Sequence, residues 1–377
     1  MRNRLKRLKR PAQIILLVFV AVVVLPVVIP LVRVAVECRM FGGGKPVETA
    51  NPAGAEPITA GLSGYARLED QTYLTLPEWY IVYSLDEYAA FIAQNPPSRF
   101  PYFGAVGQFW QSYSDVCAVT RDRYSFNSSY HLSLVVIGAS FTVENVLKGI
   151  YENTVGRVTE WISSSDLTEE DVYAREVAKE YGEFVHTIPW YEFPFGEKLR
   201  ELWGSTHGWG PNVIRKWERK TVLSVEYGLK ALYGWLIRQG ARAVYAPEDL
   251  EIQVWAAGVS EAALKQEPDV RVVRAFDGEA AIVSIPRYEA FTQIVPRLAK
   301  QGVRFVEMAG NDEILVTAFA PRDWQYDLPN GEFLFAMPIL TQPELKRVAV
   351  RVPVRSLPLV LEEMENSGVK LEHIYDY

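Results

Sequence analysis

A long uncharged segment stands out near the start of the chain. Residues 14–32 are nineteen consecutive positions without a charge, mostly Val, Leu and Ile. A helix that rises 1.5 Å per residue covers about 28 Å with this length, close to the ~30 Å hydrocarbon core of a bilayer. A cleavable signal peptide has a shorter apolar region that ends at small residues, which residues 33–37 do not supply. The pattern therefore predicts an uncleaved transmembrane anchor at residues 13–36.

The two flanks of this anchor differ in charge and composition. Residues 1–12 hold six Lys or Arg side chains and no acid, whereas only Arg33, Arg39 and Lys45 follow the span closely. The more basic flank stays in the cytoplasm. We therefore expect a basic cytoplasmic tail and a single-pass protein of the cell membrane. Most of its chain then lies outside the cytoplasm, in the periplasm if the source is a bacterium. Residues 37–64 are rich in Gly, Pro, Ala and Thr, which predicts a linker.

Residues 65–245 form an aromatic-rich region in which apolar positions recur at helical spacing. The uncharged part at 132–143 is too short to cross a bilayer and predicts a buried helix or strand. A second crossing near 132–150 is the alternative, and it would return the rest of the chain to the cytoplasm. Helices are predicted from Pro77 with Thr75 as its cap, at 106–116, at 130–162, from Ser165 or Asp166 to about 185, and at 213–245.

The second half of this region combines aromatic and basic residues in a way that predicts contact with the bilayer. Trp and Tyr favour the interface because each ring is apolar and carries a polar N–H or O–H. Residues 213–245 add an excess of Lys and Arg, which an anionic surface attracts. The alternative is a packed region whose rings are buried and whose charges face water. The predicted membrane-contact residues are Trp190, Trp203, Trp209, Lys216, Trp217, Arg219, Lys220 and Trp235.

Three acidic residues follow one another at eight-residue intervals along 130–162. Glu144 and Lys148 are spaced i, i+4 and are predicted to pair. Eight residues turn an ideal helix by about 800°, so Glu152 and Glu160 point in other directions and are predicted to be solvated. Glu144 ends an apolar run and is the acid that we expect to need a partner.

Short β-branched runs alternate with helical patterns in the C-terminal part of the chain. Residues 282–308 and 348–375 are an internal repeat of strand, amphipathic helix and strand, with Gly302 and Gly368 where each helix must stop. Two such units predict one ferredoxin-like sheet with parallel neighbours and both helices on one face. The remaining strands would extend or bridge that sheet. Strands are predicted at 250–257, 270–275, 279–285, 303–309, 312–319, 332–338, 346–352 and 369–375.

The fold class that follows is α+β. An N-terminal transmembrane helix precedes a mainly helical, aromatic-rich region. A domain of ferredoxin-like α/β-plait architecture at 246–377 completes the chain.

Composition narrows the choice of partners. The chain has 377 residues, a net charge of −7 and a pI near 5.4. It lacks the overall basic character that a nucleic-acid partner requires. Two cysteines, Cys38 and Cys117, are too few for a disulfide framework or a zinc site made of cysteines. Two unpaired thiols are the favoured interpretation, and one bridge formed outside the cytoplasm is the alternative.

No familiar catalytic motif occurs in the sequence. The chain has no Walker loop, no Gly-x-Ser-x-Gly elbow and no helix with two zinc-binding histidines. Neutral imidazole can bind a metal or act as a general base. His131, Glu144, His186 and His207 are therefore the candidates for a shared catalytic site. No spacing within one element supports that set, and neither a metal site nor a cofactor follows from it.

Two functions are consistent with these features. The favoured hypothesis is a membrane-anchored protein without enzymatic activity. Its middle region would rest on the lipid bilayer, and its C-terminal domain would bind or scaffold a protein partner. The alternative is a membrane-bound enzyme that uses the His and Glu site, with or without a metal, on a lipid-like or apolar substrate.

Overall fold

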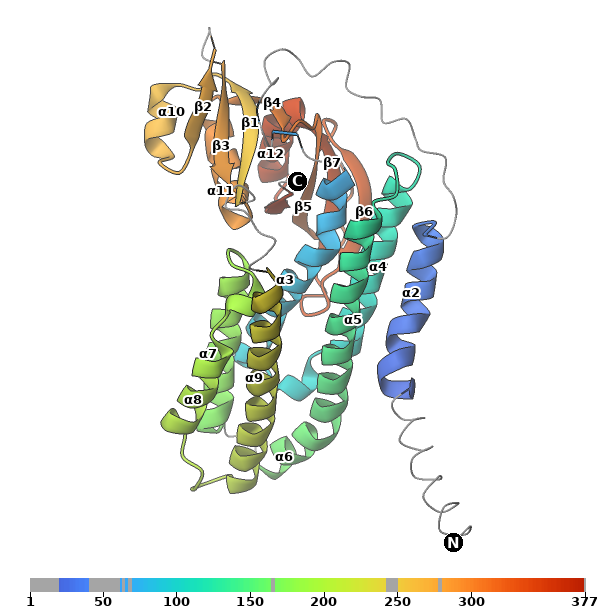
Figure 1. Ribbon diagram of the computed structural model, residues 1–377, viewed down its shortest axis with the longest axis vertical. Helices are drawn as coiled ribbons and strands as arrows, with labels where there is room; N and C mark the ends of the chain where they lie inside the picture. Colours follow the sequence, from blue (N-terminus) through green and yellow to red (C-terminus); the bar gives the residue numbers. More distant parts are fainter. Residues whose placement is uncertain are drawn as a thin grey trace.

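Helices form a bundle at one end of the molecule, and two β-sheets lie at the other end (Figure 1). The predicted tail at 1–12, the start of the predicted anchor and most of the predicted linker lie outside the described residues. The junction at 242–249 lies outside them as well. The computed structural model describes residues 20–40, 62, 65–66, 70–163, 167–241, 250–276 and 280–375.

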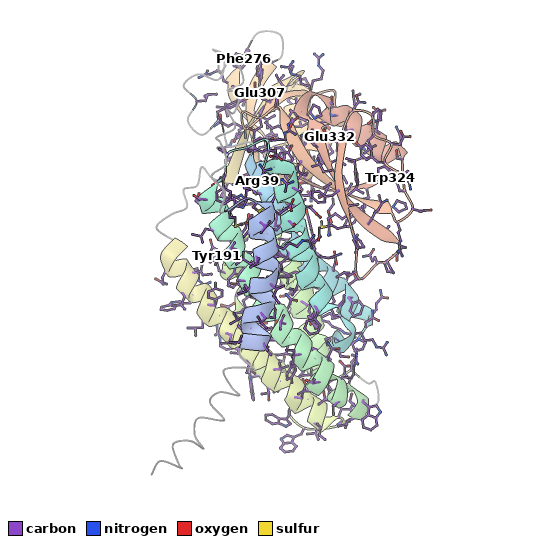
Figure 2. All side chains as sticks on the ribbon, turned by 90° about the vertical axis from the view of Figure 1, so that its right-hand side faces the viewer. Arg39, Tyr191, Phe276, Glu307, Trp324 and Glu332 are labelled. Carbon is purple, nitrogen blue, oxygen red and sulfur yellow. A yellow bond between two sulfur atoms is a disulfide. The ribbon has the colours of Figure 1, made fainter. Side chains whose placement is uncertain are left out.

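The bundle is built around α3 (Asp70–Gln94), which packs against α4, α5 and α7. A π-helical turn, η1 (Val20–Val24), leads into α2 (Leu25–Glu37). Seen from its own side, α2 lies across the front of the bundle with Arg39 at the end nearer the sheets (Figure 2). The other elements are η2 (Pro97–Arg99), α4 (Tyr102–Thr120), α5 (Ser128–Tyr151), η3 (Glu152–Gly156), α6 (Arg157–Ile162), α7 (Glu169–Val185), η4 (Trp190–Glu192), α8 (Phe195–Ser205) and α9 (Val213–Ala241).

Two helical stretches of the described chain are long and apolar enough to cross a membrane, Val20–Glu37 and Ser128–Ile162. The first is the apolar helix that the sequence predicts near the N-terminus. The second joins α5, η3 and α6 into one helix that runs away from the sheets, and α9 then returns to them (Figure 1).

Two helix starts differ from their predictions. Helix α3 already begins at Asp70, and Thr75 lies inside it, where its hydroxyl donates to the carbonyl of Thr72. The cap of α7 is Thr168 rather than Ser165 or Asp166, because Asp171 stands three residues later and completes a capping box with it.

All eight strands predicted from the sequence are present, and they form two four-stranded antiparallel sheets. The first sheet has the order β2-β3-β1-β4 and the second β6-β7-β5-β8. The strands are β1 (Glu251–Ala257), β2 (Arg271–Ala275), β3 (Ala280–Pro286), β4 (Arg304–Met308), β5 (Glu313–Pro321), β6 (Glu332–Pro338), β7 (Leu345–Pro353) and β8 (Lys370–Ile374). Helices α10 (Glu261–Gln266), α11 (Glu289–Lys300) and α12 (Leu357–Asn366) and the turn η6 (Val354–Ser356) complete this part.

The internal repeat is real, but its two copies do not share a sheet. The copies are β3-α11-β4 and β7-α12-β8, and each completes a sheet of its own. The two strands of a copy are not neighbours either, because β1 or β5 lies between them and pairs antiparallel with both. In β5, the residues from Ile314 to Ala318 are buried on both faces, which explains its central place.

The predicted helix stops within the repeat are confirmed. Gly302 and Gly368 have φ angles of +88° and +68°, which only glycine adopts without strain. The next residue in each copy donates its backbone N–H back to the helix, from Val303 to Leu298 and from Val369 to Met364.

The molecule is layered, and its two parts share a core. Helices α11 and α12 each contact strands of both sheets, and their apolar side chains form one core with the facing residues. The opposite face of the second sheet packs on the bundle. There Leu315, Ala349 and Tyr375 join a core with Tyr73 and Leu76 of α3.

Candidate functional site

Helix α9 has a polarity opposite to that of a helix on a water-soluble protein. Its inward side carries Arg215, Lys216, Arg219 and Lys220, none of them more than 5% exposed. An amphipathic helix in water buries its apolar stripe and exposes its charges, so α9 is inverted. The exposed side is largely apolar from one end of the helix to the other and includes Ile214, Trp217, Val225, Leu229, Leu232, Tyr233, Trp235 and Leu236.

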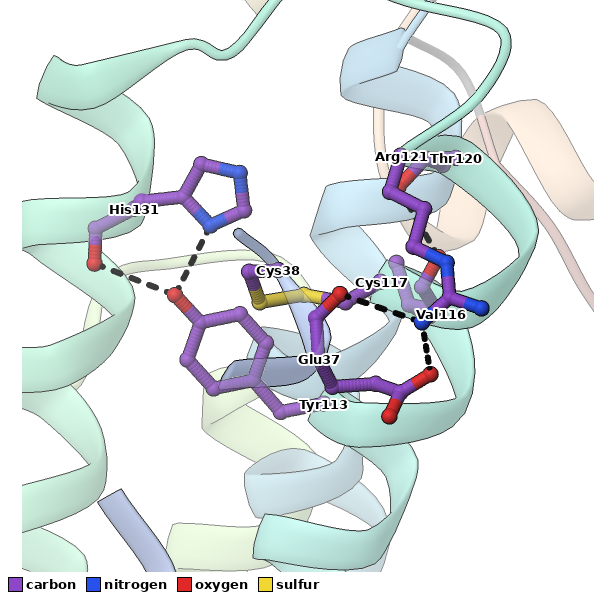
Figure 3. Close-up of a disulfide and its surroundings, with 8 residues drawn as sticks. All are labelled: Glu37, Cys38, Tyr113, Val116, Cys117, Thr120, Arg121 and His131. Atoms are coloured by element: carbon purple, nitrogen blue, oxygen red, sulfur yellow. Dashed lines mark hydrogen bonds and ion pairs between the residues drawn. A yellow bond between two sulfur atoms is a disulfide. The ribbon is translucent and has the colours of Figure 1, made fainter. Parts of the chain in front are cut away.

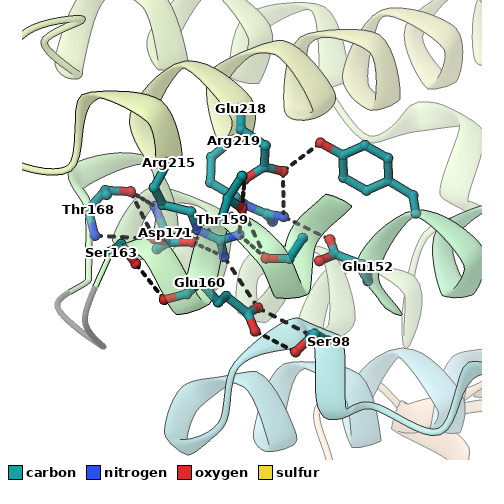
Figure 4. Close-up of polar contacts among 12 residues, drawn as sticks. Ser98, Glu152, Thr159, Glu160, Ser163, Thr168, Asp171, Arg215, Glu218 and Arg219 are labelled. Atoms are coloured by element: carbon teal, nitrogen blue, oxygen red, sulfur yellow. Dashed lines mark hydrogen bonds and ion pairs between the residues drawn. The ribbon is translucent and has the colours of Figure 1, made fainter. Parts of the chain in front are cut away.

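The two buried arginines are neutralised by acids from neighbouring elements and from α9 itself (Figure 4). Arg215 pairs with Asp171 of α7 and with Glu218, each at 2.9 Å. Arg219 pairs with Glu152 of η3 at 2.7 Å. A buried charge is stable only when it is paired and hydrogen-bonded. These contacts therefore fix α9 against both the α5–α6 helix and α7.

The two buried lysines face the start of α7 and the end of α8. The Nζ atom of Lys216 lies 3.1 Å from a carboxylate oxygen of Glu169. The Nζ atom of Lys220 donates to the carbonyl of Thr206 at 2.8 Å and lies over the ring of Trp203. Neither ammonium group is at the surface.

A second set of charges lies higher in the bundle, between α5 and α9. Lys148 pairs with Glu226 at 2.8 Å, and Lys230 pairs with Glu144, also at 2.8 Å. Glu144 thus has the partner that it was expected to need, but that partner is not Lys148. The predicted i, i+4 pair is wrong because both side chains turn toward α9.

The prediction that Glu152 and Glu160 are solvated is also wrong. Glu152 is 2% exposed, and the side chain of Glu160 is 18% exposed. Glu160 accepts a hydrogen bond from the hydroxyl of Ser98 and lies 3.5 Å from Arg215. The two side chains do point in different directions, as their spacing requires. Each of them meets other protein side chains there instead of water.

Exposed apolar side chains continue from α9 onto the helices beside it. Helix α2 packs on α5, and the ion pairs described above join α5 to α9. We call the outward sides of α2, α5–α6 and α9 the apolar wall. Besides the residues of α9, it contains Leu25, Val28, Ile29, Val32, Val36, Leu132, Val136, Leu147, Ile150, Val155, Val158, Trp161 and Ile162.

The outward side of α7 and α8 has the opposite character. Lys179 and Glu183 pair across one turn of α7, with side chains 76% and 68% exposed. Glu197 and Arg200 do the same on α8, at 65% and 79%. The bundle therefore has one apolar side and one charged side.

The predicted membrane-contact residues divide into two groups. Trp203, Trp209, Trp217 and Trp235 are 40–79% exposed, and Trp190 is half-buried against Tyr233. Lys216, Arg219 and Lys220 are buried on the inward side of α9, in the contacts described above. The sequence did not indicate this burial, because the acidic partners of these residues come from distant parts of the chain.

The four candidate catalytic residues do not come together. The Nδ1 atom of His131 lies 2.9 Å from the hydroxyl of Tyr113, and Glu144 pairs with Lys230. His207, which follows α8, is exposed and contacts Glu169 at the start of α7. Each side chain has its own partners in a different place, so the shared site expected from sequence is not assembled.

His186 joins the bundle to the sheets. Its Nε2 atom lies 2.6 Å from Asp86 of α3, and its Nδ1 atom lies 3.3 Å from Glu289 of α11. Hydrogen bonds to Asp86 and Glu289 raise the pKa of His186 to about 10. The same contact lowers the pKa of Glu289. The imidazole lies between carboxylates of α3 and α11 and in this way links the bundle to the sheets.

The two cysteines form a disulfide, so the expectation of free thiols is wrong (Figure 3). The bridge holds Cys38, just beyond α2, to Cys117 of α4. An ion pair between Arg121 and Glu37 lies beside it. In the described part of the chain, one group of side chains has the geometry of a metal site, namely these two cysteines and His131, with ligand atoms within 4.8 Å. The sulfur atoms are bonded to each other, so neither is a thiolate ligand.

Comparison of the chain with protein-family models, with curated proteins and with solved structures finds no significant match.

Proposed function

We propose that this chain is a membrane-integrated, non-enzymatic binding or scaffolding protein. Its apolar wall contacts the bilayer hydrocarbon, and its two sheets bind a protein partner outside the cytoplasm. The observation that carries this proposal is the inverted polarity of α9. An apolar surface of this extent is unfavourable in water, and ionisable groups inside membrane proteins face the interior and pair with one another.

The position of the disulfide supports the orientation. Disulfides persist outside the cytoplasm. Cys38 directly follows α2 and precedes Arg39, which lies at the end of α2 nearer the sheets (Figure 2). The excess of basic residues before the apolar segment points to the same orientation. We assign only the wall to hydrocarbon, because the outward side of α7 and α8 carries exposed Lys, Glu and Arg side chains.

The strand orders support a ferredoxin-like plait in each sheet. In the first sheet, helices follow the first and third strands and the order is β2-β3-β1-β4, which is the pattern of that fold. The second sheet repeats the order, with a loop in place of the first helix. This architecture serves many unrelated functions, so the partner-binding role rests on the position of the sheets above the bilayer.

The alternative of a membrane-bound enzyme has less support. It requires His131, Glu144, His186 and His207 in one place, and each has separate partners. The ion-paired interior is explained by the packing of α9 alone.

Fluorescence quenching in reconstituted vesicles tests the proposed contact. Lipids brominated on their acyl chains quench only tryptophans that touch hydrocarbon. We expect Trp235→Phe to remove part of the quenched signal, because Trp235 is exposed on the apolar wall. Trp324→Phe is the matched control, since Trp324 lies in the loop between β5 and β6. Equal quenching in both variants would contradict the proposal.

A further inference from the structure

An apolar groove opens where α2 meets α4 and α5. The upper part of α2 is fastened to α4, with Val34 fully buried and Cys38 in the disulfide. The lower part leaves a space of about 650 Å³, within the range of small-molecule sites. Gly107 of α4 helps to open it, since a Cβ atom there would meet nothing within 4 Å. The lining residues are Ala21, Val22, Pro26, Ile29, Pro30, Arg33, Phe103, Val106, Gly107, Trp110, Gln111, Val146 and Ile150.

The groove is apolar along its length and carries a cation at its upper end. Arg33 is the one charged residue of the lining, and it is exposed. Among the described residues, none forms a hydrogen bond or ion pair with Arg33. The guanidinium interacts electrostatically with the carboxylate of Asp115, which also accepts a hydrogen bond from the amide of Gln111 at 2.6 Å. The exposed N–H groups of Arg33 can still hold a phosphate with two parallel hydrogen bonds.

The dimensions of the groove decide what can fill it. From Ala21 to Arg33 the lining follows η1 and α2 for about 18 Å, close to the depth of one leaflet, which is about 15 Å. The length matches an acyl chain that runs along one leaflet, and a lining that is apolar apart from Gln111 and Arg33 suits a hydrocarbon chain.

We infer that this groove binds an acyl chain of an anionic phospholipid, with its phosphate group on Arg33. The inference rests on the proposed function, because the apolar segment that leads into α2 places the groove at bilayer depth. Arg33 follows the uncharged run directly, so it stands where a headgroup of the outer leaflet would lie. The bound lipid would fill the space between α2 and the bundle below the disulfide.

Photo-crosslinking in vesicles tests this inference. The probe is phosphatidylglycerol with a photoreactive group in its acyl chain, and labelled peptides are mapped by mass spectrometry. We expect labelling of α4 between Phe103 and Gln111. Gly107→Trp fills the groove and should reduce this labelling at least fivefold. Gly204→Trp is the matched control, because Gly204 of α8 also has open space around it and lies away from the groove.

Two further comparisons complete the test. The first separates the headgroup contact from the acyl-chain contact, and the second separates this inference from the proposed function. Arg33→Gln should reduce labelling by the phosphatidylglycerol probe more than labelling by a diacylglycerol probe, which lacks the phosphate group, and equal effects would contradict the role of Arg33. If Gly107→Trp leaves the labelling of α4 unchanged while peptides of α9 are labelled, the groove is not a lipid site and the proposed function stands. If neither α4 nor α9 is labelled, the proposed function itself fails.

Discussion

Arg219→Met is the change that probes the charged interior most sharply. Arg219 is 2% exposed, and its Nη1 atom lies 2.7 Å from Glu152. Glu152 is equally buried, and no other cation pairs with it among the described residues. Methionine keeps much of the length and volume of the side chain but removes the charge, so Glu152 is left as an unpaired buried carboxylate.

The expected cost follows from that unpaired charge. Removing one partner of a buried ion pair costs about 3–5 kcal/mol, whereas replacing both partners by apolar residues of similar volume is close to neutral. Arg219→Met should therefore lower the free energy of unfolding by about 3–5 kcal/mol. The double variant Arg219→Met with Glu152→Met should recover most of this loss.

Unfolding by sodium dodecyl sulfate in mixed micelles, followed by tryptophan fluorescence, measures these differences. Arg200→Met is the control, because Arg200 of α8 is 79% exposed and such a change shifts stability by less than about 0.5 kcal/mol. If Arg219→Met lowers the free energy of unfolding no more than Arg200→Met does, water reaches the ion pair between Arg219 and Glu152. If the double variant is as unstable as the single one, the pairing with Glu152 is not the source of the loss.

Three further predictions concern the sheets and their attachment. The raised pKa of His186 adds stability that is complete below pH 6.5 and is lost as the pH rises to about 10. Discounted for partial exposure, this contribution is about 1–2 kcal/mol. His186→Gln should abolish this loss when the free energy of unfolding is measured against pH. Residues 250–377 alone should unfold cooperatively but self-associate in sedimentation, because the face with Leu315 and Tyr375 loses its cover from α3; a monomer at every concentration would contradict this. A reporter fused after Tyr377 should be active only outside the cytoplasm, and cytoplasmic activity would overturn the orientation.

The local parts of the fold were predictable, because local patterns determine them. All eight strands follow from β-branched runs, and the stops at Gly302 and Gly368 follow from the need for a left-handed residue after a helix. The assembly of the strands was not predictable, because β1 and β5 enter each sheet between the two strands of a repeat copy. Strand pairing depends on contacts between distant segments, and the repeat alone contains no information about them.

The candidate site was even harder to predict than the strand pairing, because it too depends on contacts between distant segments. The sequence identifies α9 as basic and aromatic, but it does not say which side faces inward. That depends on Glu152, Glu169 and Asp171, which are 44–67 residues away from their partners. One signal was available: the outward residues of α9, Val225, Leu229, Leu232 and Leu236, recur at helical spacing, as a stripe facing lipid would. The alternative of a packed helix whose charges face water would place that stripe inward, as such stripes lie in water-soluble proteins.

Spin-label accessibility along α9 is the measurement that tests the central claim most directly. Nitroxides at Leu229 and Leu232, with Lys179 on the charged side as the reference, are compared in vesicles for collisions with oxygen, which concentrates in hydrocarbon, and with a water-soluble nickel chelate. The apolar wall predicts high oxygen and low nickel accessibility at Leu229 and Leu232, and the reverse at Lys179. High nickel accessibility at Leu229 and Leu232 would mean that the wall faces water, and the membrane-integrated account of this protein would then be wrong.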